Sequence, residues 1–144
     1  HVGIDINSLQ SNPSVTAGYY INESTKRNLT FKSGKTILAW VDYDSSQSLI
    51  SVTISRTSSK PKKPILSFVM DLSTIFHDTL YVGFSASTGL PASSHYIMGW
   101  SFKMNGPAQT LDLSSLPQLP GPKKKQTSMI IWVSIIALGL SKSA

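Results

Sequence analysis

Alternation of apolar residues with small or polar ones constrains this chain more than any other feature, and it is clearest at 80–103. Because successive side chains of a strand point to opposite faces, a period of two predicts two strands that each bury one face. The residues expected to face the interior are Leu80, Val82, Phe84 and Ala86 in the first run and Tyr96, Met98, Trp100 and Phe102 in the second. Turn-forming residues at 87–94 join the runs, so we expect two core strands that present a surface loop.

Shorter alternating runs precede this stretch. Val2, Ile4 and Ile6 predict a half-buried strand, 16–21 a weaker one, and 22–34 a polar loop or irregular edge. The run 37–44 alternates, passes a turn at Asp44-Ser45-Ser46, and is followed by 50–54, which together predict an antiparallel hairpin.

The next segment continues the pattern. Two prolines make 58–64 a loop, and Leu66, Phe68 and Met70 form another apolar face. The segment 72–78 is expected to be a turn or a single helical turn, with Ser73 as its cap. Several short strands without an amphipathic helix predict an all-β sandwich or barrel.

The composition changes after the second run. Residues 105–128 carry prolines and lysines without a strand-length apolar run, which predicts an extended linker. Residues 129–140 are strongly apolar but are followed by Lys142, whereas a membrane-spanning helix needs about 20 apolar residues. The segment is either a truncated transmembrane helix or a hydrophobic tail. We therefore divide the chain into a domain at 1–104, a linker at 105–128 and an apolar tail at 129–144.

Cysteine usage and charge exclude several kinds of site and partner. The chain has no cysteine, so neither disulfides nor a cysteine-zinc site contributes. Two glycosylation sequons begin at Asn22 and Asn28 and favour a secreted surface. The net charge of +6 arises largely from lysines at 60–63 and 123–125, and no basic stripe is interleaved with aromatic residues. Nucleic acid is therefore not an expected partner.

An enzyme needs a constellation of reactive groups, which is not evident here. Gly83-Phe84-Ser85-Ala86-Ser87 lacks the second glycine of a nucleophile elbow. Asp42 and Asp44 share one strand face, but carboxylates at a strand end are usually solvated. We expect no catalytic activity.

Five motifs in order carry a family resemblance: HVGIDINS, NLTFKSG, AWVDYD, LYVGFSASTG and SHYIMGWSF. Together they resemble the C-terminal part of the legume (L-type) lectins, as found in the extracellular region of plant lectin receptor-like kinases. The resemblance implies an antiparallel, jelly-roll-like (concanavalin-type) sandwich. The chain would hold an incomplete one, since its first motif falls at His1. Any kinase of such an architecture lies outside this chain.

The resemblance also implies site residues. The family binds Ca²⁺ and Mn²⁺ beside its sugar, and His1 matches a direct metal ligand while Ser11 matches a serine that reaches the metal through water. Most of the family's other ligands and its sugar-binding Asp, Gly and Asn have no match here, so these two residues would serve only in a complete domain. Alternatively, His1 merely ends a strand.

The specificity loop of the family falls at 87–94. Its candidate sugar contacts are Leu90, Pro91, Ala92 and Ser93, which otherwise simply close a hairpin. His95 matches a structural position at the end of this loop. Trp40, Trp100 and Phe102 are expected to pack in the core rather than to stack on sugar.

Two functions follow as hypotheses. The first is a carbohydrate-binding module, with impaired or no sugar binding on its own, of a plasma-membrane receptor-like protein that passes through the secretory pathway and displays its lectin part outside the cell. Its partners would be glycans or glycoconjugates, with 129–140 in the membrane. The second is a structural or protein-interaction domain that oligomerises through exposed sheet edges.

Overall fold

A computed structural model of the chain describes residues 1–11, 13–87 and 94–119. Every strand pair in the described residues is antiparallel, which confirms the all-β prediction. The only helical elements there are two single 3-10 turns, η1 (Phe31–Ser33) and η2 (Leu72–Thr74). The chain divides into two compact units, residues 1–86 and residues from Ser87 onward, which are described separately.

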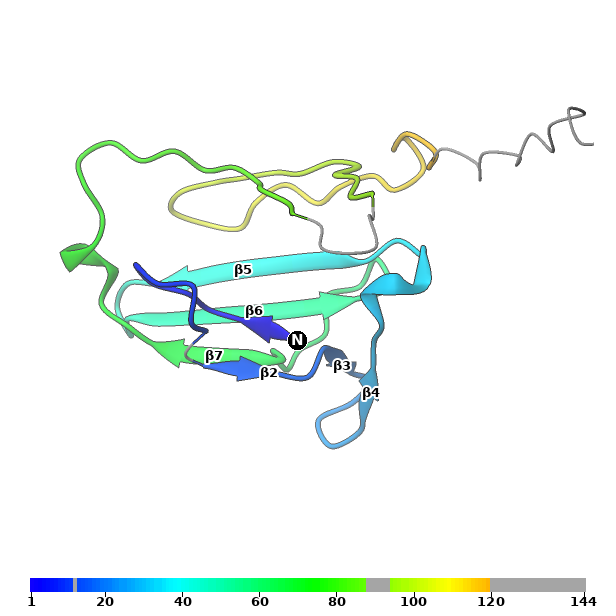
Figure 1. The fold of residues 1–144 in the computed structure, drawn as a ribbon, viewed down its shortest axis with the longest axis horizontal. Coiled ribbons are helices and arrows are strands. Elements are labelled where there is room, and N and C mark those ends of the chain that lie inside the picture. Colours follow the sequence, from blue (N-terminus) through cyan, green and yellow to red (C-terminus); the bar gives the residue numbers. More distant parts are fainter. Residues whose placement is uncertain (12, 88–93, 120–144) are drawn as a thin grey trace, which may run out of the picture. The chain divides into compact units, whose positions relative to one another are not determined.

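A three-stranded sheet is the largest element of the first unit (Figure 1). Its strands follow the order β5 (Leu38–Asp44), β6 (Leu49–Ser55) and β7 (Leu66–Val69). The predicted hairpin is confirmed, since β5 and β6 pair over seven residues from Leu38↔Ser55 to Asp44↔Leu49. The turn between them is stabilised by Asp44, whose Oδ1 accepts a hydrogen bond from the Ser46 backbone N–H at 2.9 Å.

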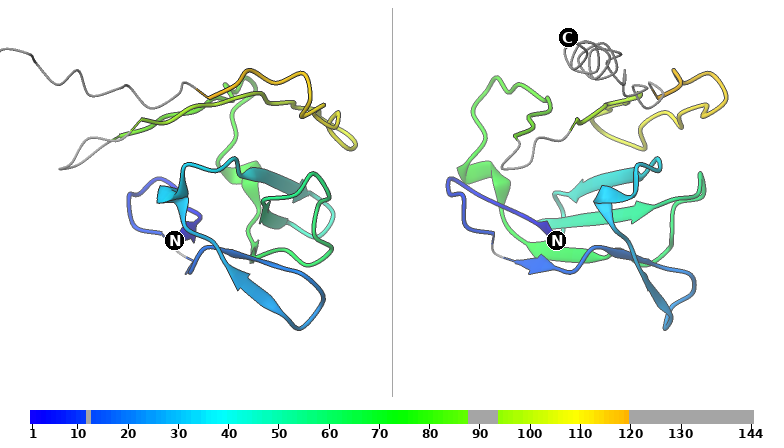
Figure 2. Two further views of the ribbon diagram at one scale, coloured as in Figure 1. Left: turned by 90° about the vertical axis from the view of Figure 1, so that its right-hand side faces the viewer. Right: turned by 45° about the vertical axis from the view of Figure 1, so that its right-hand side comes forward.

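Four short strands form two further pairs. β1 (Val2–Gly3) pairs with β2 (Ser14–Val15), and β3 (Gly18–Tyr20) pairs with β4 (Lys26–Asn28). These pairs lie in a layer apart from the three-stranded sheet, as the rotated views in Figure 2 show. The first unit is therefore a small two-layer arrangement.

The core lies between these layers. The buried apolar cluster joins the short strands to the sheet and consists of Ala17, Leu29, Val52, Ile54, Ile65 and Leu66. Val2, Ile4 and Val15 of the short-strand layer pack against it. The C-terminal part of β6 is buried on both faces, because Ile54 is 4% exposed and its neighbour Ser55 is fully buried. The Ser55 hydroxyl is satisfied there by Thr57, whose N–H donates to it at 3.1 Å.

The register of the sheet sorts its side chains onto two faces. What we call the apolar face carries Ala39, Val41, Tyr43, Ile50, Val52, Ile54, Leu66 and Phe68. What we call the polar face carries Leu38, Trp40, Asp42, Asp44, Leu49, Ser51, Thr53, Ser55, Ser67 and Val69. The apolar face is covered unevenly, since Val41 on β5 is 72% exposed while its cross-strand partner Val52 is 8% exposed.

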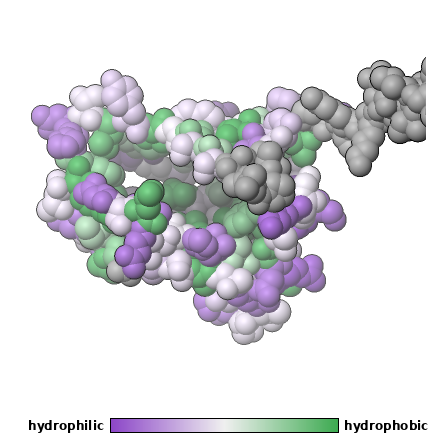
Figure 3. All heavy atoms as spheres, in the orientation of Figure 1, coloured by the Kyte–Doolittle hydropathy of each residue, from purple (hydrophilic) through white to green (hydrophobic). Residues whose placement is uncertain are grey.

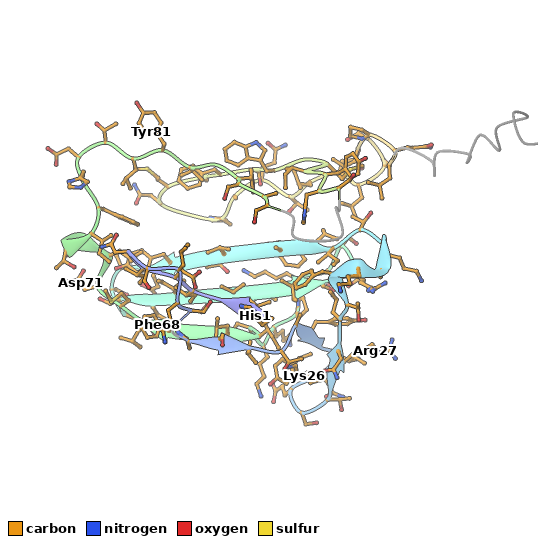
Figure 4. All side chains as sticks on the ribbon, viewed as in Figure 1. His1, Lys26, Arg27, Phe68, Asp71 and Tyr81 are labelled. Carbon is orange, nitrogen blue, oxygen red and sulfur yellow. The ribbon has the colours of Figure 1, made fainter. Side chains whose placement is uncertain are left out.

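The two runs that most suggested core strands are not strands. The described residues 80–87 and 94–103 contain no strand, and Tyr81 projects from the chain with 98% exposure (Figure 4). Trp100 and Phe102, expected in the core, are 51% and 58% exposed. Alternation shows which side chains could share a face, but a strand forms only where neighbouring backbone groups complete its hydrogen bonds.

The segment 22–34, expected to be a polar loop or an irregular edge, contains η1 and the short strand β4 of a two-stranded sheet. Two smaller expectations were wrong. The first strand ends at Gly3 rather than near Ile6. The N-cap residue of η2 is Asp71, not Ser73. The Asp71 carboxylate accepts a hydrogen bond from the Ser73 backbone N–H at 2.9 Å.

In the second unit, residues 94–119 fold back on themselves without strands. The Ser101 hydroxyl donates to the Gln109 carbonyl at 2.6 Å, and a side chain at Gly99 would meet Leu116. A turn at 112–115 repeats the Asp44 pattern, with Asp112 Oδ1 accepting from Ser114. The predicted tail at 129–140 lies outside the described residues.

Candidate functional site

His1 is exposed and leads directly into β1 (Figure 4). The pairing Val2↔Val15 and the hydrogen bond from the Ile4 N–H to the Pro13 carbonyl, at 3.1 Å, fix the backbone next to it. The imidazole therefore stands at the edge of the short-strand layer, where a ligand can reach it.

Ser11 lies against Gly3, the second residue after His1. A Cβ on Gly3 would lie 2.5 Å from Ser11 Oγ, which is closer than real Cβ contacts allow. Ser11 thus packs directly over Gly3, and only glycine leaves enough space for it at this position.

The described residues do not assemble a metal site. Within them, no group of three or more His, Cys, Asp or Glu side chains comes together. Ca²⁺ prefers six to eight oxygen ligands, and one imidazole with one hydroxyl cannot supply that coordination. His1 and Ser11 therefore do not fit the Ca²⁺/Mn²⁺ pair by themselves.

The predicted sugar-binding residues Leu90, Pro91, Ala92 and Ser93 lie outside the described residues. Their role stays a prediction.

The two sequon asparagines lie on the β3–β4 hairpin, where hydrophilic side chains gather in Figure 3. Asn22 occupies the turn, and its Oδ1 accepts from the Thr25 N–H at 2.7 Å and from the Ser24 hydroxyl at 3.2 Å. Asn28 ends β4 opposite Gly18 and is exposed. Both side chains can be reached from solvent.

A polar groove of about 280 Å³ runs along the polar face of the sheet. It is lined by Asp42, Asp44, Gln47, Leu49, Ser51, Thr53, Lys60, Lys62 and Pro64. Asp42 and Asp44 share this face as the sequence predicted. No sequence pattern predicted the contact of Lys60, which comes from the β6–β7 loop and places Nζ 2.6 Å from Asp42 Oδ2.

The Asp44 carboxyl is the groove's clearest perturbed group. Hydrogen bonds from the Ser46 side chain and backbone lower the pKa of Asp44 below its ordinary value, and a further bond from the Gln47 backbone lowers it as well. Asp44 is therefore an ionised acceptor at neutral pH.

An apolar groove of about 290 Å³ lies elsewhere in the first unit. It is lined by Ile4, Asp5, Ile6, Asn7, Ile50, Leu72, Ile75 and Phe76. Its wall of isoleucine and phenylalanine offers few hydrogen-bonding groups, so it has the character of incompletely filled core.

Known proteins resemble this chain over nearly its whole length. It is 45% identical over 146 residues to L-type lectin-domain containing receptor kinase V.9 of Arabidopsis thaliana, and 43% identical over 142 residues to receptor kinase IV.2 of the same plant. It is 39% identical over 150 residues to receptor kinase SIT2 of Oryza sativa subsp. japonica. These alignments cover 98–100% of the chain but only 21–22% of each relative, so the chain spans about a fifth of their length.

Residues 1–118 match the family model of the legume lectin domain, which is a lectin domain and not a catalytic one. Within the described residues, no helix is both long and apolar enough to cross a membrane. The matched region includes all five motifs that suggested the resemblance, and its strand pairs are antiparallel. This chain therefore belongs to the legume lectin family.

Proposed function

We propose that this chain is the carbohydrate-binding region of a receptor-like protein that is tethered to the plasma membrane and displays its lectin part outside the cell. The family match over residues 1–118 carries this proposal. The relatives' names support it, since each describes a receptor kinase with an L-type lectin domain.

The loop 87–94 would shape the sugar site, with Leu90, Pro91, Ala92 and Ser93 in contact with the glycan. Specificity loops on a rigid β-scaffold commonly act this way. His1 and Ser11 would reach the metal only in a complete domain, because no group of three or more His, Cys, Asp or Glu side chains comes together among the described residues. Metal-dependent sugar binding by this chain alone is therefore expected to be weaker than binding by a longer protein that includes it.

A glycan array tests the proposal. The 144-residue chain and a longer receptor protein containing it are applied with Ca²⁺ and Mn²⁺ and again with a chelator. Chelator-sensitive binding by the longer protein, weakened or lost in the chain alone, is the expected result. Absence of chelator-sensitive binding in both proteins would overturn the proposal.

A second candidate function is protein interaction without sugar binding. Strand β5 lies at the edge of its sheet, where β6 is its only strand neighbour among the described residues. It carries exposed Val41 and has neither lysine nor proline, so the only charges that protect this edge from pairing are those of Asp42 and Asp44. Concentration-dependent association in light scattering, together with a blank array, would favour this function.

Secretion would expose both sequons to glycosylation. The test is expression in plant cells with a secretion signal, followed by treatment with an N-glycan amidase. Asn22→Gln and Asn28→Gln should each remove one glycan, and the double variant should remove both. A secreted protein whose mobility the amidase does not change would contradict this assignment.

A further inference from the structure

The polar groove is a second place on this molecule where a ligand can bind, separate in sequence from the loop 87–94. Its floor is the polar face of β5 and β6, and its walls are the β6–β7 loop and Gln47 of the β5–β6 turn. At about 280 Å³ it is near the lower end of the size range of small-molecule sites, roughly 300–1,000 Å³. One or two small rings would fill it.

The groove is held in shape before any ligand arrives. The seven-pair ladder of β5 and β6 fixes the floor. The wall is anchored by Lys60, which pairs with Asp42 at 2.6 Å, and by Lys63, which donates to the Glu23 carbonyl at 3.1 Å. A pre-organised site loses less conformational entropy on binding, so more of its contact energy appears as affinity.

The charges in the groove balance. It contains the carboxylates of Asp42 and Asp44 and the ammonium groups of Lys60 and Lys62. An anion would meet both carboxylates, and a cation would meet both ammonium groups. Neither charge is favoured, which points to a neutral ligand.

The remaining groups suit a ligand that both donates and accepts hydrogen bonds. Gln47 has donors and acceptors, Ser51 has a hydroxyl, and the ionised Asp44 accepts only. Asp44 Oδ1 already accepts two bonds from Ser46, and its second oxygen adds acceptor capacity. Leu49 and Pro64 supply apolar surface for C–H groups.

A polyhydroxylated ring combines these properties, since its hydroxyls donate and accept while its C–H faces are apolar. We propose that the polar groove is a metal-independent binding site for a neutral saccharide. The groove is separate from the loop 87–94, because every lining residue lies on β5, on β6, in the β5–β6 turn or in the β6–β7 loop.

The test titrates the full chain with glucose, galactose, N-acetylglucosamine and their disaccharides in the presence of a chelator, and records amide chemical shifts by NMR. At least one of these sugars should bind in the millimolar range and shift the amides of Ser51 and Thr53. Asp44→Ala should weaken that binding about tenfold, because it removes a charged acceptor.

Asp112→Ala is the matched control. Asp112 accepts from Ser114 at 2.9 and 2.7 Å, the same distances at which Asp44 accepts from Ser46, but it lies outside the groove. Sugar affinity should therefore be unchanged in this variant. Lys62→Ala, a groove variant that leaves the Asp44 turn intact, should also weaken binding.

Three outcomes would overturn the inference: no sugar binding in chelator, equal weakening by Asp112→Ala and Asp44→Ala, or unaltered binding in both Asp44→Ala and Lys62→Ala. Binding that appears only with added Ca²⁺ and Mn²⁺ would support the proposed lectin site and exclude the groove. The two proposals therefore fail separately.

Discussion

The ammonium group of Lys63 lies 4.3 Å from the centroid of the Tyr20 ring. The two residues come from the β6–β7 loop and from β3, so this contact joins the edge of the sheet to the short-strand layer. The same ammonium donates to the Glu23 carbonyl at 3.1 Å. One lysine thus connects the wall of the polar groove to the hairpin that carries the sequons.

Replacing Lys63 by alanine should lower the free energy of unfolding by about 1 kcal/mol, the sum of a surface cation–π contact and one hydrogen bond. Urea denaturation followed by fluorescence measures this. Lys62→Ala removes a neighbouring lysine with the same charge and should leave stability within about 0.5 kcal/mol. Equal effects of the two variants would contradict the role of the Tyr20 contact.

Burial along the apolar face of the sheet predicts sharply unequal effects of truncation. Ile54 is 4% exposed within the core cluster, so Ile54→Ala should destabilise the fold by about 2–4 kcal/mol. Val41 lies on the same face but is 72% exposed, and Val41→Ala should change stability by about 0.5 kcal/mol or less. Thermal unfolding of the two variants measures this difference in stability. A large loss of stability in Val41→Ala would mean that β5 is covered in solution.

Gly3 should tolerate no side chain while Ser11 lies over it. Gly3→Ala forces an overlap with Ser11 and should cost about 1 kcal/mol of stability. The double variant Gly3→Ala with Ser11→Gly should recover most of that loss. Gly83→Ala is the control, since a Cβ there meets nothing within 4 Å in the described part of the chain. Failure of the double variant to recover stability would refute this packing.

The Asp44 turn should respond to acid. Ser46 lowers the pKa of Asp44, so the turn is fully supported above the carboxyl's ordinary pKa and loses that support as the pH falls through the lowered one. Ser46→Ala should move the pKa of Asp44 upward, as measured by carbon-detected NMR titration. The pKa of Asp112, which Ser114 lowers in the same way, should not move. A pKa of Asp44 that is unchanged in Ser46→Ala would contradict this account.

Sequence patterns predicted the structure correctly where the two strands that pair are adjacent in the chain. The run 37–54 contains both strands of a hairpin and its turn, so its pairing could be predicted directly, and Asp42 and Asp44 were correctly placed on one face. Five ordered motifs were enough to indicate the legume lectin family, which the match over residues 1–118 confirms.

No sequence pattern predicted the contacts between residues that are far apart in the chain. Nothing in the sequence paired Lys60 with Asp42 or Lys63 with Tyr20, because such contacts depend on where a loop passes over a sheet. The approach of Ser11 to Gly3 likewise depends on the β1–β2 pairing.

The sequence by itself determined the family, the all-β class and the hairpin at the centre of the sheet, because alternation and turn chemistry are local properties. Only the tertiary structure decided which alternating runs became strands. Residues 80–86 carry a clear apolar alternation yet contain no strand, whereas 26–28, in a segment expected to be a polar loop or irregular edge, forms β4 against β3. A strand is completed by hydrogen bonds to its neighbour, and which neighbour lies beside it is a property of the folded chain.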